Sequence, residues 1–251
     1  MEHDAKMQDP DKLQPGDLTE RSPFLRWLDN FWFYNKWKII IGGFFLTVFI
    51  IGLVQILGQG KYDTTVAVAC AYRMDTEERE RFMELLGRFC PEDYDGNGEK
   101  AVNLRWYQVY SEEEYKEAVS EAAAESMYFE VNAKYNSDEY QNFNAYILTG
   151  DSSVVMVSPY LYSILADGHR LMPLSEVYGD GELPVGATED GYGIYLSQTD
   201  FYQYNQAAQP LPDTTILCLL RATVSGEASD PDTYSHSVAM FRALADYRVS
   251  E

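Results

Sequence analysis

The sequence has few of the residues that build metal centres, disulfide frameworks and nucleic-acid surfaces. Its 251 residues include three cysteines, three histidines and 19 Lys+Arg against 40 Asp+Glu. No Cys-x-x-Cys pair is present, and no ligand set has the spacing of a metal site, so we expect neither metal nor cofactor. A chain with a net charge of −21 repels phosphate backbones, so we expect no nucleic-acid partner.

The cysteines leave two interpretations open. Cys70 and Cys218 lie in apolar, strand-like runs, while Cys90 lies beside a proline. Apolar surroundings favour three buried thiols, and one disulfide is the alternative.

Catalytic motifs are also missing. The chain has no Gly-x-Ser-x-Gly, no His-Glu-x-x-His and no P-loop, and the glycine-rich stretches GDGELP and GYGIYL lack the third glycine of a dinucleotide turn. His169 and His236 are the only histidines after residue 60. We therefore expect no enzyme activity, although a Ser-His-Asp site remains an open alternative.

A long apolar run is present. Residues 39–57, IIIGGFFLTVFIIGLVQIL, carry no charge. As a helix at about 1.5 Å per residue they would reach roughly 28 Å, about the thickness of a hydrocarbon core. The run predicts a transmembrane helix. A cleavable signal peptide is the alternative, but 38 residues precede the run and no small-x-small cleavage site follows it.

The basic residues around the run predict its orientation. Arg21, Arg26, Lys36 and Lys38 precede or flank it, and Lys61 stands alone behind it. Since cytoplasmic flanks are enriched in Lys and Arg, we expect a single-pass protein of the cell membrane, with its N-terminus cytoplasmic and its C-terminal domain extracellular.

Three shorter segments accompany the span. Residues 1–21, polar and proline-containing, predict a disordered cytoplasmic tail. Residues 22–38 are rich in aromatics, and Ser22 can cap a helix with Pro23 at its first position. They predict an interfacial aromatic-basic helix, and a partner-binding helix is the alternative. Residues 58–63 form a linker.

Residues 64–251 alternate strand-like and helix-like patterns. Capping boxes open two of the helices, with Asp75 before Glu78 and Ser111 before Glu114. The alternation predicts one α/β domain with a mainly parallel sheet and helices on both faces. We expect strands at 64–72, 102–106, 154–158, 191–198 and 214–221, and helices at 76–90, 111–128, 137–150, 160–166 and 232–247.

The first part of this domain resembles a known family. The stretches TTVAVACAY, DTEERERFMELLGRF, AVNLRWYQVY, SEEEYKEAVS and GDSSVVMVSPYLYSILADGHRLMPLSEV follow one another between about residues 62 and 177. In order and texture they resemble the first lobe of bacterial extracellular solute-binding proteins, the periplasmic-binding-protein type II group. The chain is also similar to uncharacterised single-pass envelope proteins of Gram-positive bacteria. Only 74 residues follow Val177 (251 − 177), too few for the family's second lobe, so the resemblance implies a reduced form.

The resemblance places a ligand site at the loops beyond the carboxyl ends of the strands. Tyr72, Arg73 and Asp75 follow the first strand, and Ser158 and Tyr160 follow the third. Aromatic rings stack on sugars and an arginine clamps carboxylates, so both chemistries suit solute binding. Helix capping and surface packing are the alternative roles of these residues.

The stretch DYDGNG matches the start of an EF-hand loop. Asp93, Asp95 and Asn97 fall at ligand positions, but the twelfth position is Leu104 instead of a bidentate glutamate. The mismatch favours an acidic turn between helix and strand. A low-affinity Ca²⁺ site of the extracellular type is the alternative.

Together these features predict a non-enzymatic binding or interaction module, anchored in the membrane and displayed on the bacterial envelope. Its partners would be the lipid bilayer and either another envelope protein or a small solute. The alternative function is a solute-binding receptor associated with an ABC-type transporter.

Overall fold

The computed structural model describes residues 23–57, 62–124, 132–150, 153–179, 181–224 and 229–249. The chain divides into two compact units, residues 1–60 and 61–251. Each unit is described by itself below.

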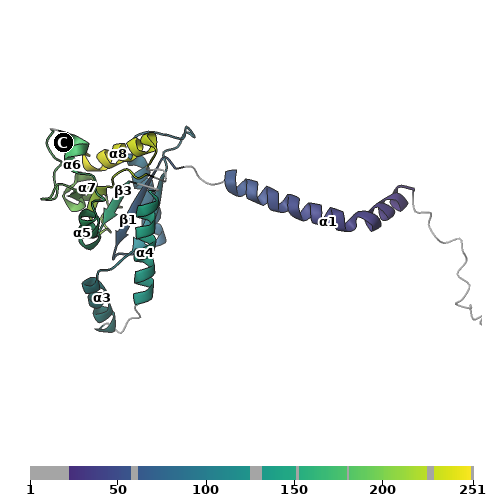
Figure 1. The fold of residues 1–251 in the computed structure, drawn as a ribbon, viewed down its shortest axis with the longest axis horizontal. Coiled ribbons are helices and arrows are strands. Elements are labelled where there is room, and N and C mark those ends of the chain that lie inside the picture. Colours follow the sequence, from purple (N-terminus) through teal and green to yellow (C-terminus); the bar gives the residue numbers. More distant parts are fainter. Residues whose placement is uncertain are drawn as a thin grey trace, which may run out of the picture. The chain divides into compact units, whose positions relative to one another are not determined.

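The described residues of the first unit form one helix, α1 (Pro23–Leu57), shown in Figure 1. It runs without a break through the predicted boundary between the interfacial and membrane-spanning segments. The stretch Phe31–Leu53, 23 residues, is long and apolar enough to cross a membrane, and none of it is buried within the structure. A signal sequence would pass the same test of length and composition.

The second unit is built on one five-stranded sheet in the order β2-β1-β3-β5-β4. Strand β1 pairs in parallel with β2 and β3, whereas β5 runs antiparallel to its neighbours β3 and β4. The expected mainly parallel sheet is thus confirmed. The strands are β1 (Thr64–Cys70), β2 (Val102–Gln108), β3 (Val154–Val157), β4 (Gly193–Tyr195) and β5 (Ile216–Leu219).

Helices cover both faces of the sheet, as predicted. The helices of the domain are α2 (Thr76–Phe89), α3 (Glu112–Ala124), α4 (Ala133–Thr149), α5 (Pro159–Asp167), α6 (Leu174–Tyr178), α7 (Asp200–Tyr204) and α8 (Pro231–Ala245). Figure 1 shows α4 alongside the sheet and α3 apart from it.

Alternate residues of the strands belong to two hydrophobic cores, one on each face of the sheet. Val66 and Val68 of β1 belong to the first core, and Ala67 and Ala69 belong to the second, because successive side chains of a strand point to opposite faces. Helices α2 and α8 supply the first core with Phe82, Leu85, Leu86, Met240, Phe241 and Leu244. Helices α4 and α5 supply the second core with Phe143, Tyr146, Ile147, Leu161 and Leu165. Every member of both cores lies between residues 66 and 245, so the second unit contains its whole core.

Several predicted boundaries were wrong. Helix α4 begins at Ala133 instead of Ser137, because the Asn132 side chain accepts a hydrogen bond from the Tyr135 N–H and caps the helix earlier. Helices α6 and α7 were not predicted, since five residues are too few to show a helical period. The predicted end of the 111–128 helix lies outside the described residues.

Candidate functional site

The carboxyl ends of β1, β2 and β3 meet at one edge of the sheet, where the predicted ligand residues lie. Tyr72, Arg73 and Asp75 connect β1 to α2, while Ser158 joins β3 to α5 and Tyr160 lies in the first turn of α5. The strands bring the two loops to the same edge. Asp75 and Ser158 cap helices, Tyr72 contacts Glu78, and Arg73 and Tyr160 line two separate hollows.

Asp75 and Ser158 are helix caps. The Asp75 carboxylate accepts the Glu78 N–H at 2.8 Å, and the Glu78 carboxylate accepts the Asp75 N–H at 3.0 Å, which completes the predicted capping box. Ser158 is buried, and its hydroxyl oxygen accepts the Leu161 N–H at 3.5 Å. For these two residues the alternative of a structural role is observed.

Tyr72 is engaged within the fold. Its hydroxyl donates to the two carboxylate oxygens of Glu78, at 2.9 and 3.0 Å, and its backbone carbonyl accepts the indole N–H of Trp106 at 3.2 Å. Partial burial, followed by the hydrogen bond to the Glu78 carboxylate, raises the pKa of Tyr72 to about 12. Tyr72 therefore stays protonated and orients Glu78 and Trp106.

Arg73 lines a hollow of about 320 Å³, here called the Arg73 hollow. Its walls come from the start of α2, the end of β2 and the first half of α4. Residues 74–76 form one side, and the remaining lining side chains are Arg73, Arg79, Trp106, Gln108, Tyr135 and Glu139. Charges of both signs and two aromatic rings thus meet in one polar cavity.

Tyr160 lines a different hollow, of about 670 Å³, called the Tyr160 hollow. Its side chain is 39 % exposed. Opposite it stand the acidic residues at the start of α3, where Ser111 and Glu114 form the second predicted capping box. The lining side chains include Glu112, Glu113, Glu114, Glu117, Pro159 and Tyr160. The five predicted ligand residues therefore do not converge on a single cavity.

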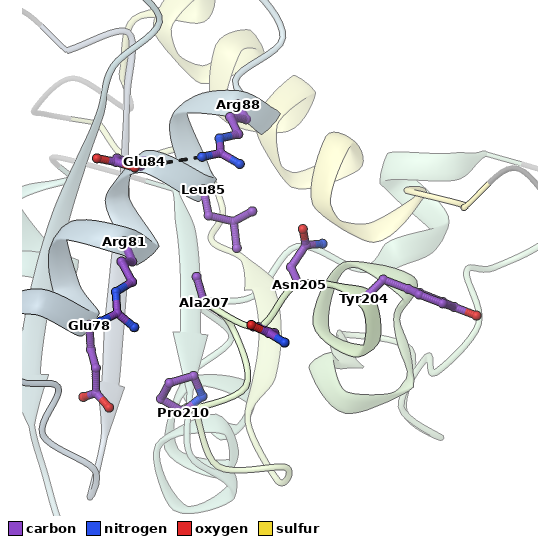
Figure 2. Close-up of a pocket in the computed structure, with 10 residues that line it drawn as sticks. Glu78, Arg81, Glu84, Leu85, Arg88, Tyr204, Asn205, Ala207 and Pro210 are labelled. Atoms are coloured by element: carbon purple, nitrogen blue, oxygen red, sulfur yellow. Dashed lines mark ion pairs between the residues drawn. The ribbon is translucent and has the colours of Figure 1, made fainter.

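A third hollow, of about 590 Å³, lies between α2 and residues 204–210, and no sequence pattern predicted it. Figure 2 shows Leu85 pointing from α2 toward the chain around Asn205 and Ala207, with Arg88 turned toward Glu84. The ion pair between Arg88 and Glu84 joins two exposed side chains at 3.9 Å. Exposed ion pairs of this kind stabilise a fold little. We therefore assign no ligand to this charged groove.

The predicted acidic turn gathers three carboxylates. One oxygen from each of Asp63, Asp93 and Asp95 lies within 4.8 Å of the others. Asp63 was not predicted as part of this site; it is only 6 % exposed and accepts backbone N–H groups of Tyr94, Asp95 and Ala101. Asn97, the third predicted ligand, hydrogen-bonds Asp95 through its side-chain amide. The backbone N–H groups already occupy much of the carboxylates' accepting capacity, so the turn is well ordered without an ion. A Ca²⁺ site here stays a prediction.

Asp93 gives this turn a pH dependence. Backbone N–H groups, foremost that of Gly98 and then those of Gly96 and Asn97, hydrogen-bond its carboxylate and hold its pKa below the usual 3.8. Because the pKa is lower in the folded state, Asp93 stabilises the fold above pH 3.8, and this contribution is lost as the pH falls through the folded-state pKa.

We expect the free energy of unfolding to fall more steeply with acidification in the wild type than in an Asp93→Asn variant. Chemical denaturation at intervals from about pH 5 to about pH 2 would measure the two slopes. Asp213→Asn, on an exposed residue, serves as the control. Parallel curves for wild type and Asp93→Asn would contradict the assignment.

The three cysteines are free thiols, and the alternative of a disulfide is not formed. Burial raises the pKa of Cys70 to about 12 and that of Cys90 to about 11, and it also raises the pKa of Cys218 far above its ordinary value. The thiolate is the reactive form of cysteine, so none of the three is prepared for attack at neutral pH.

We expect the native protein to react negligibly with an aromatic disulfide reagent at neutral pH, and to titrate three thiols once it is unfolded. A Ser137→Cys variant, which places a thiol on the exposed side of α4, should react at the rate of a free cysteine. Rapid reaction of a thiol in the unmodified native chain would contradict the burial.

No family model matches the chain. The curated proteins and the solved structures contain no match either.

Proposed function

We propose that the chain is a membrane-anchored, non-enzymatic binding module of the bacterial envelope, with its N-terminus in the cytoplasm and its sheet domain outside. The apolar stretch Phe31–Leu53 supports the anchor. The concentration of Lys and Arg before this stretch, against Lys61 alone behind it, supports the orientation.

One observation carries the proposal: the Arg73 and Tyr160 hollows, at the carboxyl edge of the sheet, are lined by one lobe only. All the strands of the described residues belong to one sheet. A two-lobed receptor encloses its solute in the cleft between its lobes. A single lobe offers the same edge as an open surface, which suits a protein contact or a weakly held solute.

The environments of the cysteine and histidine side chains support a non-enzymatic role. The cysteines are buried with raised pKa values, as described above. His236 stacks on Tyr94 with ring centroids 3.6 Å apart and planes at 11°. His169 adopts a positive φ of 52° just after α5, where the chain turns out of the helix. These histidines have packing and turn roles.

A receptor that feeds an ABC-type transporter is the second candidate. The order of strands and helices over 64–177, with both capping boxes formed, agrees with the resemblance to a solute-binding lobe. The receptor function predicts tight solute binding. A solute present at 100 times its dissociation constant would add about 2.7 kcal/mol of stability, which moves the unfolding midpoint by several degrees.

Labelling of intact cells that produce the full chain tests the anchor and its orientation. Since the native thiols are buried, a membrane-impermeant maleimide should label a Ser137→Cys variant in intact cells. A Ser22→Cys variant should be labelled only after permeabilisation. The reverse pattern, or recovery of the domain in the medium without the helix, would overturn the proposal.

Position-specific cross-linking tests the binding surface. A photoreactive phenylalanine analogue at position 160 should give a discrete adduct in living cells. The same analogue at position 148, which is exposed near the C-terminal end of α4, should give none. Adducts that are identical at both positions, or missing at both, would count against a binding role of this edge.

A further inference from the structure

The Arg73 hollow holds two arginines in a domain that is poor in cations. Residues 61–251 carry 13 Lys+Arg (19 − 6) against 33 Asp+Glu (40 − 7). The guanidinium of Arg79 donates one hydrogen bond to the Leu104 carbonyl at 3.1 Å, which anchors it beside β2. Within the described part of the chain Arg79 has no ion pair. A guanidinium held in place by one bond keeps donors for a carboxylate, which it can grip with two parallel hydrogen bonds.

A carboxylate of the same hollow is also without a cationic partner. Glu139 projects from α4, is half-buried, and accepts one long hydrogen bond, 3.3 Å, from the Asn142 amide. Across the described ranges it forms no ion pair, although Arg79 lines the same hollow. Opposite charges that share a cavity without pairing can each bind the complementary charge of a ligand.

Gln108 adds an acceptor that the fold leaves unused. Its side chain is only 7 % exposed, and its amide nitrogen donates to the Ala71 carbonyl and the Tyr110 hydroxyl, at 3.3 and 2.8 Å. The bond to the Ala71 carbonyl, which can only accept, fixes which end of the amide is nitrogen. The other end, the oxygen Oε1, has no hydrogen-bond partner among the described residues. A buried carbonyl without a donor is energetically unfavourable, so a donor from a ligand in the adjoining hollow would be favoured.

The aromatic walls and the volume limit the size of the ligand. The indole of Trp106 is held by its hydrogen bond to the Tyr72 carbonyl, and the Tyr135 ring is 40 % exposed across from the start of α2. The hollow of about 320 Å³ lies at the lower end of the range of small-molecule pockets. It suits a molecule the size of an amino acid or a dipeptide.

We propose that the Arg73 hollow binds a small zwitterion, a free amino acid or a dipeptide, with its carboxylate toward Arg79. The ammonium group then lies toward Glu139 and Oε1 of Gln108. This assignment rests on the proposed binding function, for which it supplies the class of ligand.

Trp106 offers a direct readout. The four tryptophans of the chain are Trp27, Trp32, Trp37 and Trp106, and the first three belong to α1. Replacement of those three by phenylalanine in the full chain, held in lipid nanodiscs, leaves one fluorophore at the wall of the hollow. We expect L-alanine or glycylglycine to change the emission of Trp106 saturably. The two titrations separate the free amino acid from the dipeptide.

Matched ligands and variants complete the test. Acetate and methylammonium each carry one of the two charges and should bind at least about tenfold more weakly than the zwitterion. Arg79→Gln and Glu139→Gln should each weaken binding by a similar factor, whereas Arg88→Gln, on the same helix but outside the hollow, should leave it unchanged. Urea denaturation of each variant shows whether it is folded.

Three results would each overturn the proposal. The first is no change in Trp106 emission up to about 10 mM ligand, since binding weaker than this is too weak for a specific site. The second is acetate binding as tightly as alanine, and the third is unchanged binding in both the Arg79→Gln and the Glu139→Gln variant. None of these depends on the orientation of the helix or on the cross-links from position 160. Failure of the zwitterion site is therefore distinguishable from failure of the proposed function.

Discussion

Replacement of Asp63 by alanine should lower the free energy of unfolding by about 3 kcal/mol. The buried carboxylate accepts the backbone N–H groups of Tyr94 at 2.6 Å, Asp95 at 3.2 Å and Ala101 at 2.8 Å. Alanine would leave all three donors without an acceptor, and each such loss costs about 1–3 kcal/mol before water replaces the lost bonds. Because Tyr94, Asp95 and Ala101 are half-buried, water recovers part of that cost.

Urea denaturation of the fragment 61–251, which contains the complete core, would measure this loss. Asp63→Asn should fall between wild type and alanine, since its amide keeps one accepting oxygen but turns a donor toward one N–H group. Asp213→Ala, on an exposed aspartate, should change the stability by less than about 0.5 kcal/mol. Equal stability of Asp63→Ala and wild type would refute the role of this carboxylate in joining the acidic turn to the start of β1.

Truncation of Phe241 to alanine should cost about 3–5 kcal/mol. Phe241 is fully buried in the core formed by α2 and α8, together with Met240 and Leu244. Removal of the ring takes away its buried apolar surface and leaves a cavity that the packed neighbours fill only in part. The expected consequence is a fall in the thermal midpoint of roughly 10 °C.

The matched control for Phe241 lies on the same helix. Ser235 is exposed on α8, so Ser235→Ala should stay within about 0.5 kcal/mol of wild type. Both variants can be compared by thermal unfolding followed by circular dichroism. A loss below about 1.5 kcal/mol for Phe241→Ala would mean that α8 closes the core less tightly than its burial indicates.

Features set by neighbouring residues could be predicted from the sequence. The capping boxes at Asp75 and Ser111 formed as expected, because a cap depends on residues three positions apart. The end of α4 at Gly150 could also be predicted, because glycine readily adopts the positive φ, here 72°, that closes a helix. The alternation of strands and helices then determined the layers of the domain.

Features set by distant residues could not be predicted in this way. Asp63 binds backbone groups 31 to 38 positions away, and no local pattern marks such a partner. The walls of the Arg73 hollow follow from strand register, which places Trp106 beside Val68 and Gln108 beside Cys70. The one sequence signal for this hollow was Gln108, a polar residue at the end of the strand-like run 102–108. Tyr135 belongs to α4 only because this helix begins at Ala133, earlier than predicted.

The order of the strands also bears on how the domain is made. In sequence β5 is the last strand, yet it lies between β3 and β4 and supplies hydrogen bonds to both. During synthesis β4 therefore has no neighbouring strand until Leu219 has left the ribosome, and α8 closes the first core later still. Pairings between distant segments form slowly, and unpaired strand edges favour aggregation. A chain that stalls before β5 thus leaves one edge of β3 unpaired and open to association with other chains.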